Sequence, residues 1–475
     1  MIFKKDLIYK ISKKASIALI IIQLISVLLL ATQKKQEDFL NNSSQKIDFS
    51  QQFNFSKNKN IIILVIDSFQ TDFFQEIINK DNSYKKMFNG FTYFRNAAGG
   101  FPATAFSTPL ILTSKYYDNS QPKKIFLKKA FLSDSSISKI LKKNGFLADI
   151  YPSNLFYYNN ETISNYKEYN KTKNVKLLFN KDILFDYIQL FDITLFRICP
   201  HFFKKNIYAN RSWFLKRILT LKKINRLLSK HNQENDFENN IINEKPNLFS
   251  ENSLNDVNVK FIQEMHLKAA ADYDKPAFKY YHLAGIHPPI YLDENLKHHY
   301  NALPATRESY ITNAKGILKL TGIFIDILKR NKIYDNSMIF IIADHGTQHI
   351  PVDLKPIGFK ETNTTSQIDT FNLGSGLPLI LVKPFNSQTN FEISDAPVSL
   401  ANIGATIFDA LHITEAEQIE KSMFKIGKED KIYRRFLHHN WGREEQNSDY
   451  MPKITEYTIS GFSWLRSSWK LKKKK

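Results

Sequence analysis

The chain has 475 residues, of which 43% are hydrophobic, and a formal net charge of +20 at pH 7. This length and composition allow one large α/β domain with additions, and no internal repeat is apparent, which argues against a solenoid or propeller. A single cysteine, Cys199, excludes an intrachain disulfide. The excess of positively charged side chains is compatible with three kinds of partner: nucleic acid, an anionic membrane or a phosphorylated substrate.

An uncharged apolar segment at 15–32 predicts a transmembrane anchor, because eighteen helical residues span roughly 27 Å of a hydrocarbon core about 30 Å thick. Five lysines precede the segment and only two follow closely. The positive-inside rule therefore places the N-terminus in the cytoplasm and the rest of the chain on the periplasmic or extracellular side. The alternative is a cleaved signal peptide, but 29–33 offers no small-x-small cleavage site. In this setting the positive charge favours membrane headgroups or an anionic glycolipid over nucleic acid.

Residues 33–58 are rich in Lys, Gln, Asn and Ser and predict a polar spacer. Residues 61–66 then form an unbroken apolar run that ends at Asp67. A run this short predicts a strand buried on both faces, as in parallel sheets. Ligands of open α/β sheets bind beyond the carboxyl ends of such strands, so Asp67 lies where a site would form. Taken alone, Asp67 fits equally well as the N-cap of a following helix.

Glycines and a proline at 99–102 predict a loop after a short strand at 91–94. The segment that follows is apolar and compatible with a helix, and Thr104 lies near its start. There the backbone N–H groups and the helix dipole favour an anion. The competing interpretation makes Thr104 an ordinary N-cap.

A helix at 133–144 and a strand at 146–151 continue the alternation that predicts a mainly parallel sheet. Residues 177–230 differ, because aromatic and cationic side chains are mixed there. The mixture fits either a helix pair at a membrane interface or an ordinary helical insertion packed on the domain, and both interpretations stay open. Residues 231–256 are rich in Asn and Glu and predict a loop.

A further buried strand at 279–285 is stopped by two prolines, which leaves His287 at the same edge of the sheet. An amphipathic helix at 310–330 precedes the next buried strand at 337–343.

That strand leads into Asp344, His345 and Gly346, where the glycine would permit a tight turn. Two buried strands that each deliver metal-type ligands at the C-terminal tip predict one site built from distant parts of the chain. Asp67 and Asp344 would be its carboxylates.

Beyond this point we predict a loop carrying His349, a strand at 377–382 and a helix that opens at 395–400 with a proline in its first turn. The basic end of the chain either contacts anionic headgroups or is a solvated tail.

These separated motifs resemble those of the alkaline phosphatase superfamily, in its sulfatase-like branch. Within that branch the chain is most similar to membrane-anchored phosphoethanolamine and phosphoglycerol transferases and to lipoteichoic acid synthases. The resemblance covers roughly residues 58–415 and implies an α/β fold with a central, mostly parallel sheet flanked by helices. Together with the segments predicted above, it gives this division: a cytoplasmic stub and anchor at 1–32, a spacer at 33–58, a catalytic domain at 59–415 with an insert at 177–230, and an extension with a basic tail at 416–475.

The resemblance also implies residue roles. Asp67 matches the first metal carboxylate of the family, and Thr104 matches its nucleophile. Asp344 and His345 match its metal-binding pair. His287 resembles a histidine that contacts the phosphoryl group.

The chain departs from sulfatases at the nucleophile. They need Cys or Ser there, which is converted to formylglycine, and an Arg four residues on; this chain has Thr104 and Thr108. Sulfate hydrolysis by the formylglycine route is therefore not expected. The four or five membrane helices usual in the transferases are reduced to one predicted anchor.

We expect one divalent metal, held by Asp67, Thr104, Asp344 and His345, because hard oxygen ligands and imidazole suit Zn²⁺ or Mn²⁺, with Mg²⁺ as a further option. Thr104 would attack a phosphodiester and form a phosphothreonine intermediate. His287 would stabilise phosphoryl oxygens or protonate the leaving group.

His349 has three open interpretations: it orients a ligand, belongs to a second metal site, or is a surface loop histidine.

Three functions follow. The first is a transferase that moves a phospho-substituent from a membrane phospholipid to an envelope glycan or glycolipid, with no nucleic acid partner. The second is a phosphodiesterase or related hydrolase with water as acceptor. The third is a catalytically inactive, lipid-sensing membrane protein, which predicts an eroded site.

Overall fold

The computed structural model describes residues 45–151, 162–168, 181–209, 212–214, 247–358, 368–414, 420–439 and 448–474, together with Lys14. The chain divides into two compact units, one formed by Met1–Tyr169 with Pro246–Lys475 and the other by Asn170–Lys245. The predicted anchor at 15–32 lies outside the described residues. Within the described ranges, no helix combines the length and apolar character needed to cross a bilayer.

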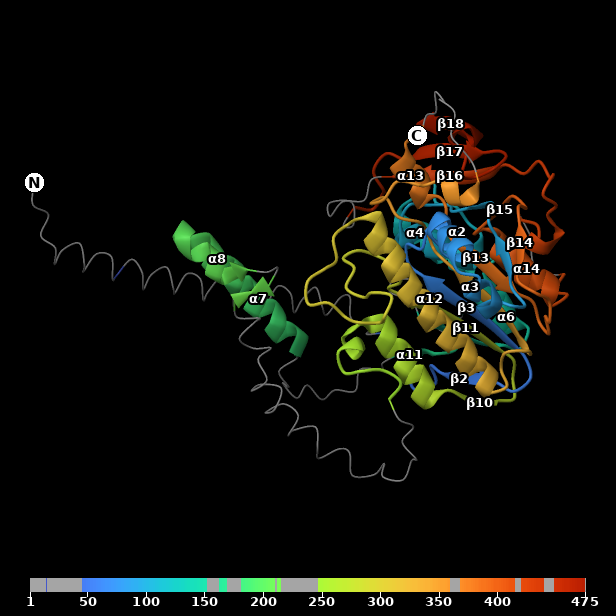
Figure 1. The fold of residues 1–475 in the computed structure, drawn as a ribbon, viewed down its shortest axis with the longest axis horizontal. Helices are drawn as coiled ribbons and strands as arrows, with labels where there is room; N and C mark the ends of the chain where they lie inside the picture. Colours follow the sequence, from blue (N-terminus) through green and yellow to red (C-terminus); the bar gives the residue numbers. More distant parts are fainter. Residues whose placement is uncertain are drawn as a thin grey trace, which may run out of the picture. The chain divides into compact units, whose positions relative to one another are not determined.

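The first unit is built on a central sheet with the strand order β14-β4-β13-β12-β3-β11-β6 (Figure 1). Among these strands only β13 runs antiparallel to its neighbours. The predicted α/β class with a mostly parallel central sheet is therefore confirmed. The strands are β3 (Asn60–Ile66), β4 (Thr92–Phe94), β6 (Leu147–Tyr151), β11 (Ala277–Leu283), β12 (Ser337–Ile342), β13 (Ile380–Lys383) and β14 (Glu392–Ser394).

Burial explains why the central strands are unbroken apolar runs in the sequence. Every residue of β3 and of β12 is buried, as expected for strands covered on both faces. β3 lies between β11 and β12, and the register pairs Ile66 with Leu283 and Val65 with Ile342. The three strands therefore end at nearly the same level, so the residues that follow them share one edge of the sheet.

Most of the longer helices described in the first unit fall into two packed groups. α2, α11 and α12 pack together, and α4 packs against α5, α6 and α14; in Figure 1, α2 and α12 lie in front of the sheet. Arg307 ties α12 to α2, because its guanidinium lies 2.8 Å from both Asp72 and Glu76. The helices are α2 (Thr71–Lys80), α3 (Ser83–Met87), α4 (Thr104–Thr113), α5 (Lys123–Leu132), α6 (Ile137–Lys143), α11 (Val257–Lys268), α12 (Arg307–Arg330), α13 (Thr370–Ser375) and α14 (Asn402–Ala410).

The predicted helix start at 395–400 is wrong. Val398 and Ser399 instead form β15, which pairs with β5 (Ala97–Ala98), and α14 begins at Asn402. The Asn402 side chain explains the later start, because its Oδ1 accepts hydrogen bonds from Ser399 N at 2.6 Å and from Ser399 Oγ at 3.0 Å. Such a local side-chain bond holds a turn in place of the first helical turn.

Part of the range predicted as a free spacer, 33–58, packs on the domain instead. Phe53 and Phe55 are buried, and the two strands of this segment each pair with a later part of the chain. Because most residues of the range are polar, its composition did not predict that these aromatic side chains would be buried. The paired strands are β1 (Gln45–Ile47) with β7 (Tyr166–Glu168), and β2 (Asn54–Ser56) with β10 (Ala270–Tyr273).

A buried ion pair fastens this docked segment to the sheet. Lys279 Nζ in β11 lies 2.7 Å from Asp149 Oδ2 in β6 and also donates to the backbone carbonyl of Gln51 at 3.0 Å. The Lys279 side chain is 0% exposed and that of Asp149 is 5% exposed, so solvent screens the pair little.

We expect Lys279→Met to lower the free energy of unfolding by about 3–5 kcal/mol, because the Asp149 carboxylate is then buried without a counter-charge. Urea unfolding monitored by fluorescence measures the change. The double variant Lys279→Met/Asp149→Leu should recover most of the loss, since it removes both charges. A double variant no more stable than the single one would contradict this electrostatic explanation.

The basic end of the chain is paired in a strand as far as Lys474, and Lys470 and Lys472 in that strand are exposed to solvent. This strand, β18, pairs with β17, and Trp469 at its start is 2% exposed. The Trp469 ring packs against Phe436 at a centroid distance of 5.3 Å, and a Cβ at Gly376 would lie 2.5 Å from the indole. This small sheet shares a second hydrophobic core with α13. Its strands are β16 (Arg434–His438), β17 (Thr455–Ile459) and β18 (Trp469–Lys474).

The second unit contains α7 and the short α8, followed by a hairpin of β8 and β9. α7 falls inside the range 177–230 that predicts a helix pair. Residues 215–230, where the second helix of that pair would continue, lie outside the described residues. The elements are α7 (Lys181–Ile198), α8 (Lys204–Ile207), β8 (Tyr208–Ala209) and β9 (Ser212–Trp213).

Candidate metal centre

Asp67, which directly follows β3, is held in place by the turn after β11. The Asp67 N–H donates to the Leu283 carbonyl at 3.3 Å, and its own carbonyl accepts from Ile286 N at 3.0 Å. Gly285 has a φ of +59°, and a Cβ there would lie 2.5 Å from the backbone N and O of Asp67. Only glycine permits this approach, so Gly285 fixes the direction in which Asp67 leaves its strand.

Asp344 and His345 follow β12 and are oriented by backbone groups. Asp344 is fully buried, and its Oδ1 accepts from the N–H groups of His345 at 3.0 Å and Ser68 at 3.4 Å. His345 Nδ1 lies 2.7 Å from the Gly346 carbonyl. A carbonyl can only accept, so Nδ1 carries the proton and Nε2 keeps a free lone pair, as in metal-binding histidines. Residue 346 must be glycine because its backbone lies close to Gly374. A Cβ at position 346 would lie only 2.1 Å from the Gly374 carbonyl O.

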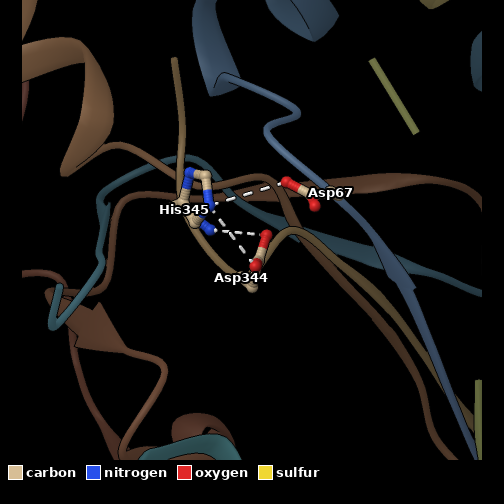
Figure 2. A group of neighbouring side chains, drawn as sticks. All are labelled: Asp67, Asp344 and His345. Carbon is tan, nitrogen blue, oxygen red and sulfur yellow. Dashed lines mark hydrogen bonds and ion pairs between the residues drawn. The ribbon is translucent and has the colours of Figure 1, made fainter. Parts of the chain in front are cut away.

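These ligand atoms point at one another, as Figure 2 shows for Asp67, Asp344 and His345. His345 Nε2 lies 3.5 Å from Asp67 Oδ1 and 3.4 Å from Asp344 Oδ2, and the ligand atoms of all three residues lie within 4.8 Å of one another. Thr104 Oγ1 lies 3.4 Å from both Asp67 Oδ2 and His345 Nε2. Donors bound tetrahedrally to one Zn²⁺ ion are about 3.3 Å apart, so the spacing suits a single cation.

Two buried atoms of the centre that lack hydrogen-bond partners also indicate a cation site. Asp344 Oδ2 and His282 Nε2 are buried and have no hydrogen-bond partner. Buried polar atoms nearly always have one, and a divalent metal would satisfy both. Carboxylate, hydroxyl and imidazole groups are the donors that such metals use in proteins.

Asp67 is held in its charged form. Burial alone would raise its pKa, but the pairing with His282 and the attraction to His345, His282 and His287, at the acidic pH where these rings are protonated, lower the pKa to about 2. A metal ligand must be deprotonated, and Asp67 therefore meets that condition at neutral pH.

Thr104 is the first residue of α4, and the N-cap is Ala103. The interpretation of Thr104 as a simple N-cap is therefore wrong. Its hydroxyl faces Asp67 and His345 instead of capping its own helix.

His287 and His349 belong to the surroundings of the centre. His287 is exposed, and its Nδ1 donates to the Pro288 carbonyl at 2.7 Å, which leaves Nε2 available to a substrate. Burial, and to a smaller extent repulsion from the charged form of His287, lower the pKa of His349. Within the described ranges, neither ring has a hydrogen bond or ion pair to Asp67, Asp344 or His345.

His282 is a residue of the centre that was not predicted from the sequence. Its side chain is 1% exposed, and Nε2 lies 3.7 Å from Asp67 Oδ2 and 3.8 Å from Asp344 Oδ2. The sequence did contain one indication of this role, because His282 is the last but one residue of a strand that is otherwise buried. The register pairs it with Val65, two residues before Asp67.

Several solved structures resemble the chain in fold. A lipoteichoic acid synthase, LtaP from Listeria monocytogenes, is 10% identical over 91% of this chain and 90% of that chain, with a TM-score of 0.43. A phosphonate monoester hydrolase from Silicibacter pomeroyi is 12% identical over 87% and 88%, with a TM-score of 0.44. The C-terminal periplasmic domain of EptC from Escherichia coli, in complex with Zn, is 11% identical over 83% and 92%, with a TM-score of 0.39. No curated protein matches the chain significantly.

The sulfatase family model matches residues 59–413. This range is well over half of the 475 residues and includes Asp67, Thr104, Asp344 and His345. The resemblance to the sulfatase-like branch of the alkaline phosphatase superfamily is confirmed: the chain belongs to the sulfatase family.

Proposed function

We propose that the chain is a metal-dependent phosphotransferase. It moves a phospho-substituent of the phosphoethanolamine or phosphoglycerol type from a membrane phospholipid to an envelope glycan or glycolipid. The position of the Thr104 hydroxyl, 3.4 Å from both Asp67 Oδ2 and His345 Nε2, carries the proposal. Threonine supplies an alkoxide nucleophile but is not a formylglycine precursor, which favours phosphoryl transfer over sulfate hydrolysis.

A bound divalent cation, Zn²⁺ or Mn²⁺ by its donor set with Mg²⁺ as a further option, would lower the pKa of the hydroxyl and offset charge on the phosphoryl oxygens. Asp67 Oδ2 is placed to accept the Thr104 proton. Thr104 Oγ1 then bonds to phosphorus while the bond to the diacylglycerol oxygen breaks, and His287 Nε2 protonates that oxygen. An acceptor hydroxyl displaces Thr104 in the second step and gives its proton to His287, while Asp67 returns its proton to Thr104 Oγ1.

The geometry disfavours a catalytically inactive, lipid-sensing protein. Such a protein has no need of a nucleophile beside its ligand set, yet Thr104 lies within 3.4 Å of two ligand atoms.

The membrane setting of this proposal is supported by an exposed surface of the second unit. Ile198, Phe202 and Phe203 are 70%, 69% and 47% exposed, and Lys204 and Lys205 follow directly. We call these five residues the aromatic–cationic tip. Apolar side chains beside cations suit the boundary between acyl chains and anionic headgroups, which favours the membrane-interface interpretation of the insert. With the predicted anchor, it supports a catalytic domain on the periplasmic or extracellular side.

Cys199 lies beside the aromatic–cationic tip and is the single cysteine of the chain. We expect a spin label on Cys199, in the full chain embedded in nanodiscs with phosphatidylglycerol, to be more accessible to oxygen than to a polar nickel reagent. Phe202→Ser/Phe203→Ser should reverse that ratio. Tyr300→Ser, at a position 84% exposed in the first unit, should leave it unchanged. A label on the unmodified chain that prefers the nickel reagent would reject membrane contact.

Incubation of the full chain with labelled phosphatidylethanolamine and phosphatidylglycerol in vesicles, with a glycolipid acceptor, tests the reaction. We expect diacylglycerol release and transfer of the headgroup label to the acceptor. Release of free headgroup phosphate ester with an unmodified acceptor would identify a hydrolase instead. Absence of turnover by a chain that binds its cation would support the lipid-sensing alternative.

A further inference from the structure

We propose that His282 is a further protein ligand of the same cation, so that two imidazoles enter its coordination shell with the two carboxylates. This inference rests on the proposed metal dependence. His282 lies in the interior of a strand and outside the residues that the family resemblance assigned to the metal.

The protonation of the His282 ring leaves the required lone pair free. Tyr280 Oη donates its single proton to Thr108 Oγ1 at 3.4 Å, so it can only accept from His282 Nδ1, which lies at 3.5 Å. Nδ1 therefore carries the ring proton and Nε2 a lone pair. Nε2 is also the buried atom that has no hydrogen-bond partner.

The sheet brings His282 to the carboxylates from the side opposite His345. β3 lies between β11 and β12, so Asp67 extends from the middle strand, His282 belongs to β11 and His345 follows β12. Nε2 of His282 lies 3.7 Å from Asp67 Oδ2 and 3.8 Å from Asp344 Oδ2. These distances are slightly longer than the 3.4 and 3.5 Å between His345 Nε2 and the same two carboxylates.

Charge and chemistry agree with this assignment. Two carboxylates balance one divalent cation, and a second neutral imidazole adds a donor without burying another negative charge. Two nitrogen donors favour Zn²⁺ over Mg²⁺ and Ca²⁺, which prefer oxygen donors. Thr104 Oγ1 would then be a fifth donor, a coordination number that zinc reaches during catalysis.

X-ray absorption spectroscopy of the full chain loaded with Zn²⁺ counts imidazole ligands without relying on activity. We expect two imidazoles in the unmodified chain and one in His282→Ala, with Zn²⁺ affinity by chelator competition at least about 10-fold weaker. His349→Ala, which removes a neighbouring histidine of the same site region, should keep two imidazoles and full affinity.

A second variant keeps the test decisive if His282→Ala folds poorly. His282→Cys loaded with Co²⁺ should show a thiolate-to-metal charge-transfer band in the near ultraviolet that the unmodified chain, which also carries the free thiol of Cys199, does not show. One imidazole in the unmodified chain, or no charge-transfer band in a folded His282→Cys chain that binds Co²⁺, would overturn the inference and leave the proposed function standing. An unmodified chain that binds no divalent metal would instead overturn the proposed function.

Discussion

Thr104→Ala is expected to lower turnover by at least about 10⁴-fold and to abolish any covalent phosphoprotein, because removal of an activated nucleophile leaves only binding and electrostatic contributions. The hydroxyl lies 3.4 Å from Asp67 Oδ2, and no other hydroxyl of the described residues makes a hydrogen bond to both Asp67 and His345. Headgroup release from labelled phospholipid measures the rate. Mass spectrometry of the acid-quenched chain measures phosphorylation at Thr104.

Thr104→Ser is the matched control, since it keeps the oxygen and removes one methyl group. It should retain a phosphorylated intermediate and most of the rate. Zn²⁺ binding should persist in Thr104→Ala, because two carboxylates and an imidazole remain. A Thr104→Ala chain with normal turnover would show that the nucleophile is elsewhere.

Asp344→Asn is expected to have opposite effects on stability with and without the cation. Asp344 is fully buried, and its Oδ2 has no hydrogen-bond partner, so a neutral amide should keep or raise the melting temperature in a chelator. The unmodified chain should gain about 2.7 kcal/mol at a cation concentration of 100 times Kd, and the variant should lose that gain. Turnover should fall at least about 10³-fold, since several kcal/mol of charge stabilisation are removed.

Asp72→Asn provides the comparison, because Asp72 is a fully buried carboxylate of the same unit that pairs with Arg307 away from the metal centre. It should destabilise the chain equally with and without the cation. Thermal unfolding in chelator and in Zn²⁺ separates the two variants. Equal stabilisation of the unmodified and Asp344→Asn chains by Zn²⁺ would contradict a ligand role for Asp344.

The central sheet and most of the centre could be predicted because burial leaves a direct trace in the sequence. Strands covered on both faces are continuous apolar runs, and the residue that ends each run marks the carboxyl edge of the sheet. Asp67 and Asp344 were found in this way. Thr104 was found from its position at the start of an apolar helix and from the family resemblance.

Other features depend on contacts that the sequence does not record. His282 faces the carboxylates only because of the register of β11 against β3, and register is a property of paired strands. The segment around Phe53 is polar on average, so its docking was missed. β18 was missed because the lysines that follow Trp469 suggested a solvated tail, although its pairing with β17 and the burial of Trp469 hold it in place.

The docking of residues 45–56 shortens the segment that could connect the domain to the anchor proposed at 15–32. For a chain anchored at 15–32, as proposed, the linker is confined to 33–44, and twelve residues extend to at most about 40 Å. A free spacer over 33–58 would have allowed roughly twice that reach. The domain would therefore work on acceptors close to the leaflet that holds its anchor, and a glycan acceptor would need to be lipid-linked or newly exported.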